Sequence, residues 1–446
     1  MSSRTAPPWP LVALFTAGYL AAYLLPTTVG RLDAGLPLSA TEAGSIGSAL
    51  LLSSAAAGFL LAAHVHRVGP RRLARIGLLL AAAGYGTAAV SHSIPVVVAG
   101  AVAGGFGSGT ATTVAATGIA AQRNPHQAST LGLLSVSALA GAVYLTVPHL
   151  GPGHGLPLAA IALTALLVWP ATGRLSSPAR AATAPRETGR LPHRGPGLVL
   201  AGGILCWSLA QNSLWGVSGR IGLTQAHLSE VTVGLVFAVA LGAGLLGVIG
   251  AGMLGPRLGR ALPVGAGTAL IAGCITLSAS ATGLGTFATG EIAWNALYPI
   301  VLSYLIGLAA SLDRRGRWAV LVGSASSLGT AAGPLTGSVL AARAGFPAMG
   351  TILAAGLLAI ALPLAAVARQ PGGRPLLPGA VRRRGGAPAA VAAVPSGGAV
   401  GAVAPAGACE QPVVEIPFDT PAAPDRGAYG TAGPRQTTAA PGPGTP

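Results

Sequence analysis

Polar side chains interrupt the long apolar stretches of this sequence, and the densest set lies around residue 290. Glu291, Asn295 and Tyr298 are spaced i, i+4 and i+7, which places them on one face of a helix, and Trp294 lies beside them. Such groups are costly in lipid, so they usually face the interior of a helix bundle or a wet cavity. A buried carboxyl among them could carry a proton or pair with a cationic ligand.

Three other apolar stretches carry polar residues on roughly one helical face. Each candidate has a second interpretation: the amides of Gln211 and Asn212 could serve only to bond neighbouring helices. Tyr23 and Trp215 could be interfacial or packing residues, and Glu291 is close enough to a helix end to be solvated. The candidates for ligand contact are Tyr19, Tyr23, Ser108, Thr112, Gln211, Asn212, Trp215, Trp294, Asn295 and Tyr298, with Thr27, Thr113 and Ser208 on the same faces and Glu291 as the candidate for proton transfer.

No constellation typical of an enzyme accompanies these residues. The chain has 10 acidic residues and 3 cysteines, and no stretch gathers paired carboxylates, a Ser/His/Asp set or a His/Cys/Asp metal cluster. His149 and His154 share a Gly/Pro-rich loop that supplies no third ligand. We therefore expect no catalytic residue, no metal and no cofactor, and a protein that is not an enzyme.

The composition is that of a protein with many membrane crossings. Only 8% of the residues are charged, 52% are hydrophobic and the mean hydropathy is +0.66, whereas about 25% of the residues of a soluble domain are charged. At roughly twenty residues per crossing, we predict an all-α integral membrane protein with twelve spans in two halves of six. The predicted spans are 10–30, 42–63, 75–92, 94–119, 128–148, 156–172, 197–218, 230–253, 263–282, 287–311, 318–341 and 347–368.

Arginine placement supports this count and predicts an orientation. All 26 basic residues are Arg, and of those between the first and last spans fifteen fall on one side and three on the other. Because short loops rich in Arg stay in the cytoplasm, we predict cytoplasmic termini and a location in the plasma membrane. The basic excess thus indicates topology, with the lipid bilayer as partner, rather than nucleic-acid binding. We expect a monomer.

These patterns divide the chain into four parts. Residues 1–172 form the first half, 173–196 a polar cytoplasmic linker, 197–369 the second half and 370–446 a tail. Pro, Gly and Ala dominate the tail, and it lacks the apolar periodicity that a core requires. We predict that the tail is disordered.

Two matching turns relate the halves. His66-Arg67-Val68-Gly69-Pro70-Arg71-Arg72 follows the second span, and Pro256-Arg257-Leu258-Gly259-Arg260 follows the eighth, 190 residues later. Two halves, twelve spans and this repeated turn resemble the major facilitator superfamily, whose loop signature runs G-x-L-x-D-R-x-G-R-R. The family's aspartate is replaced by His66 and Pro256, so the cytoplasmic charge cluster to which it belongs is weakened or has other partners.

The resemblance implies roles for several residues. Proton-coupled members often carry an Arg where this chain has Ala101, so proton coupling depends on Glu291 alone. A Gly-Pro pattern typical of the fifth span of drug antiporters occurs here in the eleventh span, and we interpret it as a helix that bends against a neighbour. The residues expected to take part in the conformational change, as loop or gating residues, are Arg67, Gly69, Arg71, Arg257, Gly259, Arg260, Gly333 and Pro334.

The resemblance also implies a mechanism. In the family the first, fourth, seventh and tenth spans line a central cavity, so the four polar faces are expected to converge there. We expect a secondary transporter that moves a neutral or weakly cationic small molecule by alternating access, by export and with proton coupling. The absence of Arg from the predicted spans' interiors argues against multiply anionic substrates. The alternatives are an uptake permease of the same fold and a membrane sensor or scaffold that does not transport.

Overall fold

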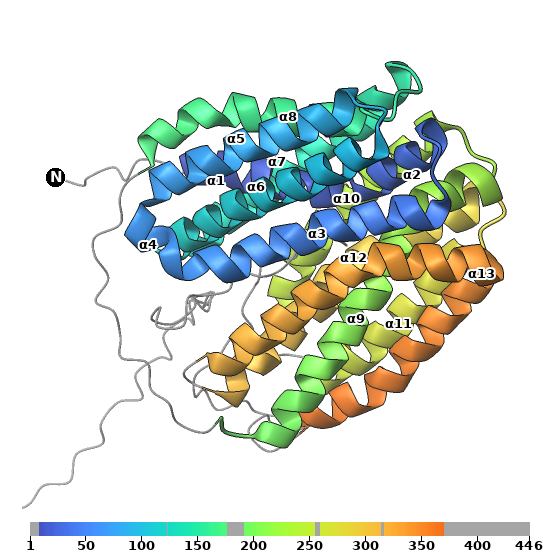
Figure 1. Cartoon of the computed structure of the whole chain (residues 1–446). Coiled ribbons are helices and arrows are strands. Elements are labelled where there is room, and N and C mark those ends of the chain that lie inside the picture. Colours follow the sequence, from blue (N-terminus) through green and yellow to red (C-terminus); the bar gives the residue numbers. More distant parts are fainter. Residues whose placement is uncertain (1–8, 123, 176–190, 255–258, 314–315, 370–446) are drawn as a thin grey trace, which may run out of the picture. The chain divides into compact units, whose positions relative to one another are not determined.

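Helices make up the regular structure of the computed structural model, which describes residues 9–122, 124–175, 191–254, 259–313 and 316–369. Figure 1 shows the helices of the first half packed as one bundle and those of the second half as another. The first bundle contains α1 (Trp9–Tyr23), α2 (Leu25–Gly35), α3 (Ala40–Leu61), α4 (Val65–Val68), α5 (Pro70–Val90), α6 (Ile94–Ala120), α7 (Pro125–Thr146) and α8 (Leu156–Val168). The second contains α9 (Arg194–Arg220), α10 (Glu230–Leu254), α11 (Ala261–Ala279), α12 (Leu284–Leu312) and α13 (Arg317–Arg369).

The number of apolar segments agrees with the sequence prediction. Among the described residues, 10 helices are long and apolar enough to cross a membrane, and α1 with α2, bent by 47°, makes an eleventh segment. Helix α13 is two helices joined at Gly345, whose φ of 80° and ψ of 164° are not helical, so it supplies two segments. The predicted all-α membrane fold is confirmed, although the first segment extends to Gly35 rather than to residue 30.

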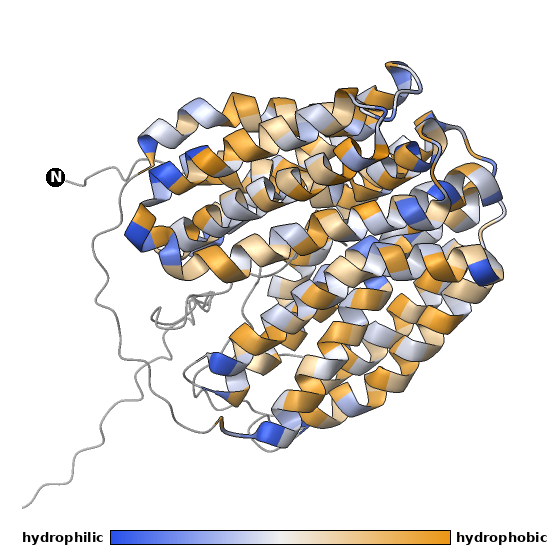
Figure 2. Ribbon diagram, viewed as in Figure 1, coloured by the Kyte–Doolittle hydropathy of each residue, from blue (hydrophilic) through white to orange (hydrophobic). Residues whose placement is uncertain are grey.

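Hydropathy along the helices indicates a lipid environment. Apolar residues run along the helix lengths, while hydrophilic residues gather at helix ends and turns (Figure 2). Large apolar side chains are also strongly exposed, with Leu362 at 77% and Leu167 at 71%. Exposure on this scale is unfavourable in water. The chain is therefore a multi-pass membrane protein.

Parts of the predicted linker and the whole tail lie outside the described residues. A 3-10 turn, Trp169–Arg174, carries the first half into the predicted linker, and α9 begins at Arg194, before the predicted boundary at residue 197. Residues 176–190 and 370–446 are not described, so the predictions about them remain predictions.

The bend between α1 and α2 follows from Pro26. Proline has no N–H, so the Ala22 carbonyl, four residues earlier, lacks the donor that a continuous helix would provide. The indole of Trp215, in α9 of the other half, donates to this carbonyl at 3.2 Å. The Tyr144 hydroxyl donates to the next carbonyl, that of Tyr23, at 2.5 Å. Because lipid offers no replacement donor, these two side chains stabilise the bend.

Glycines bring α6 against two neighbours. A Cβ built on Gly84 of α5 would lie 2.4 Å from the Gly104 nitrogen of α6, so the two backbones are in direct contact. On the other side of α6, a Cβ on Gly105 would lie 2.3 Å from the Leu50 carbonyl oxygen of α3. This close packing of small residues sets the position of Ser108, which follows in the same helix.

Replacing Gly84 tests this packing. Gly84→Leu should lower stability by about 1–3 kcal/mol or more, because backbone atoms that cannot move aside occupy the space of the new side chain. Gly86→Leu in the same helix is the matched control, since the nearest atom to its Cβ is 4.0 Å away, in Ala162. The yield of monodisperse protein and the apparent Tm in detergent measure the effect, and equal values for the two variants would contradict it.

Candidate functional site

A small cavity lies where α1, α3, α5 and α6 of the first half meet α13 of the second. Its volume is about 30 Å³, which holds no more than one or two water molecules, whereas sites for organic ligands measure about 300–1,000 Å³. The conformation is therefore closed around this point. The polar residues of the wall are Tyr19, Ser54, Tyr85, Ser108, Thr112, Thr113, Ser327 and Thr330, and no residue of the wall is charged.

The structure brings only part of the predicted ligand set to this cavity. Tyr19, Ser108 and Thr112 line it. Ser54, Tyr85 and the two α13 hydroxyls were not predicted, because the faces of α3, α5 and α13 were not among the expected cavity walls. Hydroxyl-bearing residues occur in most of the spans, so their spacing carries no signal by itself.

The candidates from the seventh and tenth spans form a separate, tightly packed aromatic cluster. Gln211 accepts a hydrogen bond from the Trp294 indole. The rings of Trp215 and Trp294 lie 5.7 Å apart, and those of Trp294 and Tyr298 lie 6.2 Å apart. All four side chains are buried, and none of them lines the cavity. The expectation that four polar faces converge at one point is therefore met only in part.

Asn212 connects this cluster to the cavity. Its side-chain nitrogen donates to the Thr330 hydroxyl at 3.2 Å and to the Ser208 carbonyl at 2.8 Å, and Thr330 lies in the cavity wall. The amide thus bonds neighbouring helices, which was the alternative interpretation of this residue. Its side-chain oxygen is buried without a partner among the described residues.

Glu291 is fully buried, in α12 of the second half, and not at a solvated interface. Its Oε1 accepts hydrogen bonds from Ser218 of α9 at 2.8 Å and from Ser278 of α11 at 2.6 Å. Its Oε2 has no partner among the described residues. The nearby Asn295 donates to the Glu291 backbone carbonyl at 3.0 Å. Glu291 lies outside the cavity wall, so its carboxylate is not placed to pair with a ligand there.

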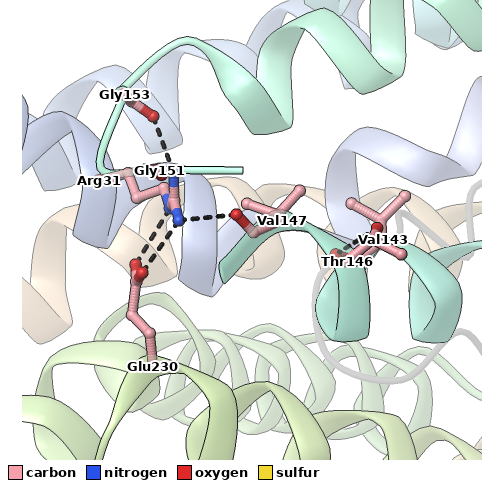
Figure 3. Close-up of polar contacts among 7 residues, drawn as sticks. All are labelled: Arg31, Val143, Thr146, Val147, Gly151, Gly153 and Glu230. Atoms are coloured by element: carbon pink, nitrogen blue, oxygen red, sulfur yellow. Dashed lines mark hydrogen bonds and ion pairs between the residues drawn. The ribbon is translucent and has the colours of Figure 1, made fainter. Parts of the chain in front are cut away.

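Arg31, at the end of α2, is the centre of a polar network that joins the two halves (Figure 3). Its guanidinium is only 4% exposed and forms a two-point ion pair with Glu230 of α10, at 2.9 and 3.0 Å. It also donates to the carbonyls of Gly151, Gly153 and Val147, at 2.8, 3.0 and 3.2 Å. A planar guanidinium suits such a two-point contact. All five contacts fix the end of α2 against α10 and the loop after α7.

A second ion pair joins the halves at the same end. Arg220, the last residue of α9, lies 3.1 Å from the carboxylate of Asp33 of α2. Further into the bundle, the Leu335 N–H of α13 donates to the Ser48 hydroxyl of α3 at 2.9 Å. Within the described residues, both ion pairs between the halves thus lie where α2 ends. By the predicted topology, this is the external end.

The expected conformational residues are only partly described. Gly69 and Gly259 have φ of 93° and 66°, a region that favours glycine. Arg67 and Arg71 are exposed, and Arg71 approaches the Leu175 carbonyl at 3.4 Å. Arg257 lies outside the described residues.

Three other members of that set lie at helix contacts or ends. Arg260 precedes α11, and burial lowers the pKa of its guanidinium below the ordinary value. Gly333 packs against α9: a Cβ on it would lie 2.4 Å from the Asn212 Cβ. Pro334 lies in the same contact, and the helical dihedral angles of α13 break at Gly345 rather than at this proline.

The comparison with protein families decides the identity of this fold. The family model of the Major Facilitator Superfamily matches residues 11–312. The chain belongs to the major facilitator superfamily. In this family the two helix bundles form the two halves of a membrane transporter, and the resemblance stated from the Arg/Gly turns is confirmed.

Two solved structures of major facilitator proteins share the architecture. The human organic anion transporter MFSD10 (TETRAN) is 18% identical, with a TM-score of 0.55, and the match covers 81% of this chain and 100% of that one. A mutant of the nucleoside transporter NupG is 10% identical, with a TM-score of 0.62, and the match covers 80% of this chain and 99% of that one. No match was found among curated proteins. At these identities the likeness concerns the fold.

Glu230→Gln tests the closure by Arg31. The variant removes the charge but keeps the size and the three carbonyl contacts, so the fold should persist while the closed end loosens. A single cysteine placed at Ala22, with the native cysteines replaced, should be labelled about three- to tenfold faster by an impermeant maleimide added on the Arg31 side. This ratio of labelling rates corresponds to a loss of about 1 kcal/mol in the stability of the closed end. The loss is set below that of a buried ion pair because the Glu230 side chain is 37% exposed.

Glu42→Gln is the control for this variant. Glu42 is an exposed acid at the start of α3 and bonds only to Ser39, three residues before it. Equal labelling rates in the Glu230 and Glu42 variants would show that the Arg31 pair does not hold the halves together.

Proposed function

We propose that this protein is a secondary transporter that carries a small organic molecule across the plasma membrane by alternating access of its two halves. The observation that carries the proposal is the closed cavity, because its wall combines helices of the first half with α13 of the second. A ligand held there would be enclosed by both halves. Movement of one half relative to the other would then expose the site to one side or the other.

The cavity wall favours a neutral or weakly cationic substrate. No residue of the wall is charged, so a phosphorylated or multiply anionic molecule would be buried without compensation. Leu50, Leu51 and Phe59 add apolar surface to the hydroxyl groups. The wall is therefore suited to a partly apolar metabolite or drug.

We propose export as the direction, with both termini in the cytoplasm. In Figure 1, α4 lies at the opposite end of the first bundle from α2, the helix that carries Arg31. The exposed Arg67, Arg71 and Arg72 belong to α4 and to the start of α5, and the arginine bias assigns that end to the cytoplasm. In the present conformation the ion pairs hold the halves together at the other end. When the closed cavity widens at the end without these ion pairs, a substrate would therefore enter from the cytoplasmic side.

Paired metabolite profiles of source cells with and without the gene test this function. We expect a compound that accumulates inside the cells and disappears from the medium when the gene is deleted. A compound left unconsumed in the medium would instead indicate uptake. Unchanged pools under several growth conditions would contradict transport and favour the sensor or scaffold alternative.

Glu291 is the proposed proton carrier. It is a fully buried acid near the start of α12, held by hydroxyls of α9 and α11. A proton gained or lost by the carboxylate changes its charge, and hence its contacts with two other helices. Because the carboxylate is outside the cavity wall, proton and substrate would occupy different places. Coupling would then act through the packing of α9 and α12.

Glu291→Gln tests this coupling. The amide keeps the size of the side chain but cannot release a proton, so transport of the exported compound driven by a pH gradient should fall at least tenfold. Exchange of the same compound without a gradient should persist, which shows that the variant is folded. Glu42→Gln is the control and should retain gradient-driven transport. Unchanged gradient-driven transport by the Glu291 variant would exclude this residue as the proton carrier.

A further inference from the structure

Three hydroxyl groups of the cavity wall already donate their protons within the protein. Thr112 donates to the Ser108 carbonyl at 3.0 Å, and Thr113 donates to the Gly109 carbonyl at 2.7 Å. On the opposite side of the cavity, Ser327 of α13 donates to the Gly323 carbonyl at 3.0 Å. A hydroxyl has one proton and two lone pairs. These three oxygens can therefore only accept a hydrogen bond from a ligand.

Two further hydroxyls of the wall are buried and unsatisfied. Tyr85 and Ser108 are 0% and 1% exposed. Among the described residues, neither hydroxyl has a partner in hydrogen-bond geometry. An unpaired buried hydroxyl is unfavourable, so both indicate the place of a ligand or water. Among these five hydroxyls, two can donate to a ligand and three can only accept from it.

The wall also lacks any charge that would compensate an ion. A bound ammonium group would satisfy the acceptors, but a buried cation without a counter-charge is strongly unfavourable. Glu291, the buried acid of the second half, is outside the wall, and its Oε1 is occupied by Ser218 and Ser278. Bound anions would meet the lone pairs of Thr112 and Thr113, which repel them.

We propose that the cavity selects an uncharged ligand that binds through its own hydroxyl or N–H donors. This inference rests on the proposed function, because it takes the cavity as the transport site. The proposed function allows a neutral or a weakly cationic substrate, and the inference restricts the substrate to a neutral one. Polyhydroxylated compounds and neutral amides fit this chemistry. Ethers and ketones fit less well, since they bring no donor for the lone pairs of Thr112, Thr113 and Ser327.

A binding screen on the purified full chain tests the ligand class. Thermal shifts are measured with three panels of similar molecular size: neutral polyhydroxylated compounds and amides, amines including quaternary ones, and carboxylates with phosphates. We expect the stabilising compounds in the neutral panel, and we expect O- or N-methylated derivatives to bind at least tenfold more weakly. Hits concentrated among ions, equal binding of methylated derivatives, or no neutral hit would overturn the proposal.

Two variants assign the binding to the wall. Thr112→Val and Ser327→Ala each remove one acceptor and should weaken binding of the strongest neutral hit about fivefold. Thr110→Val is the matched control: Thr110 is on the same helix, is 2% exposed and donates to the Phe106 carbonyl at 2.8 Å, but lies outside the wall. Equal effects of the Thr110 and Thr112 variants, or none at Thr112, would overturn the assignment.

The binding assay does not depend on transport. A neutral ligand that binds but is not moved by the protein in liposomes would contradict the proposed function and leave this inference standing. A transported cation that competes for the cavity would support transport and overturn the inference.

Discussion

Every backbone carbonyl inside a bilayer needs a hydrogen-bond donor, and Pro26 removes the donor of the Ala22 carbonyl. The replacement comes from the other half of the molecule, through the indole of Trp215. The bend of the first helix and this one contact between the halves are therefore linked through one missing N–H. A second contact of this kind joins the Leu335 N–H to the Ser48 hydroxyl, directly after Pro334. In both halves, a proline lies beside a hydrogen bond that crosses between them.

The Arg31 network is a further contact that holds the two halves together, at the end of α2. Its guanidinium is buried, and only its ion pair with Glu230 crosses between the halves, so this pair must be replaced when the halves separate. Glu230 is partly exposed, and water can reach it and the loop carbonyls at this end of the bundle. The cost of opening is therefore smaller than for an ion pair in the interior, where an unpaired charge has no solvent. An ion pair that water can partly reach suits a contact that must form and break as the two halves change arrangement.

The uncharged cavity wall and the buried carboxylate of Glu291 lie in different parts of the bundle. The cavity wall contains hydroxyls and no charged group, while the buried acid of the second half is held by two serines away from that wall. A charge beside the cavity would select ions, and its titration would change the site directly. With the acid placed between α9, α11 and α12, a change in its protonation alters helix packing instead. Substrate recognition and proton binding then involve different helices, and contacts such as the Asn212–Thr330 hydrogen bond between α9 and α13 link them.

Much of the architecture was predictable from the sequence. Length and apolar composition determine how many segments can cross a bilayer, because lipid accepts only long apolar helices with internally paired backbones. The turn glycines Gly69 and Gly259 were predictable as well, since both adopt positive φ. These features depend on local chemistry and on the bilayer.

The composition of the site was not predictable in the same way. Helical spacing identifies residues that share a face, but it does not say which helix that face meets. Gln211 and Trp294 share such faces and contact each other rather than the cavity, whereas Thr330 reaches the cavity from a helix that was not expected there.

The pairing of Arg31 with Glu230 joins residues 199 positions apart. The sequence by itself determined the membrane class, the number of spans and the polar residues available for function. Only the tertiary structure decided which of them meet, because contacts between helices depend on how each helix is rotated and bent against its neighbours.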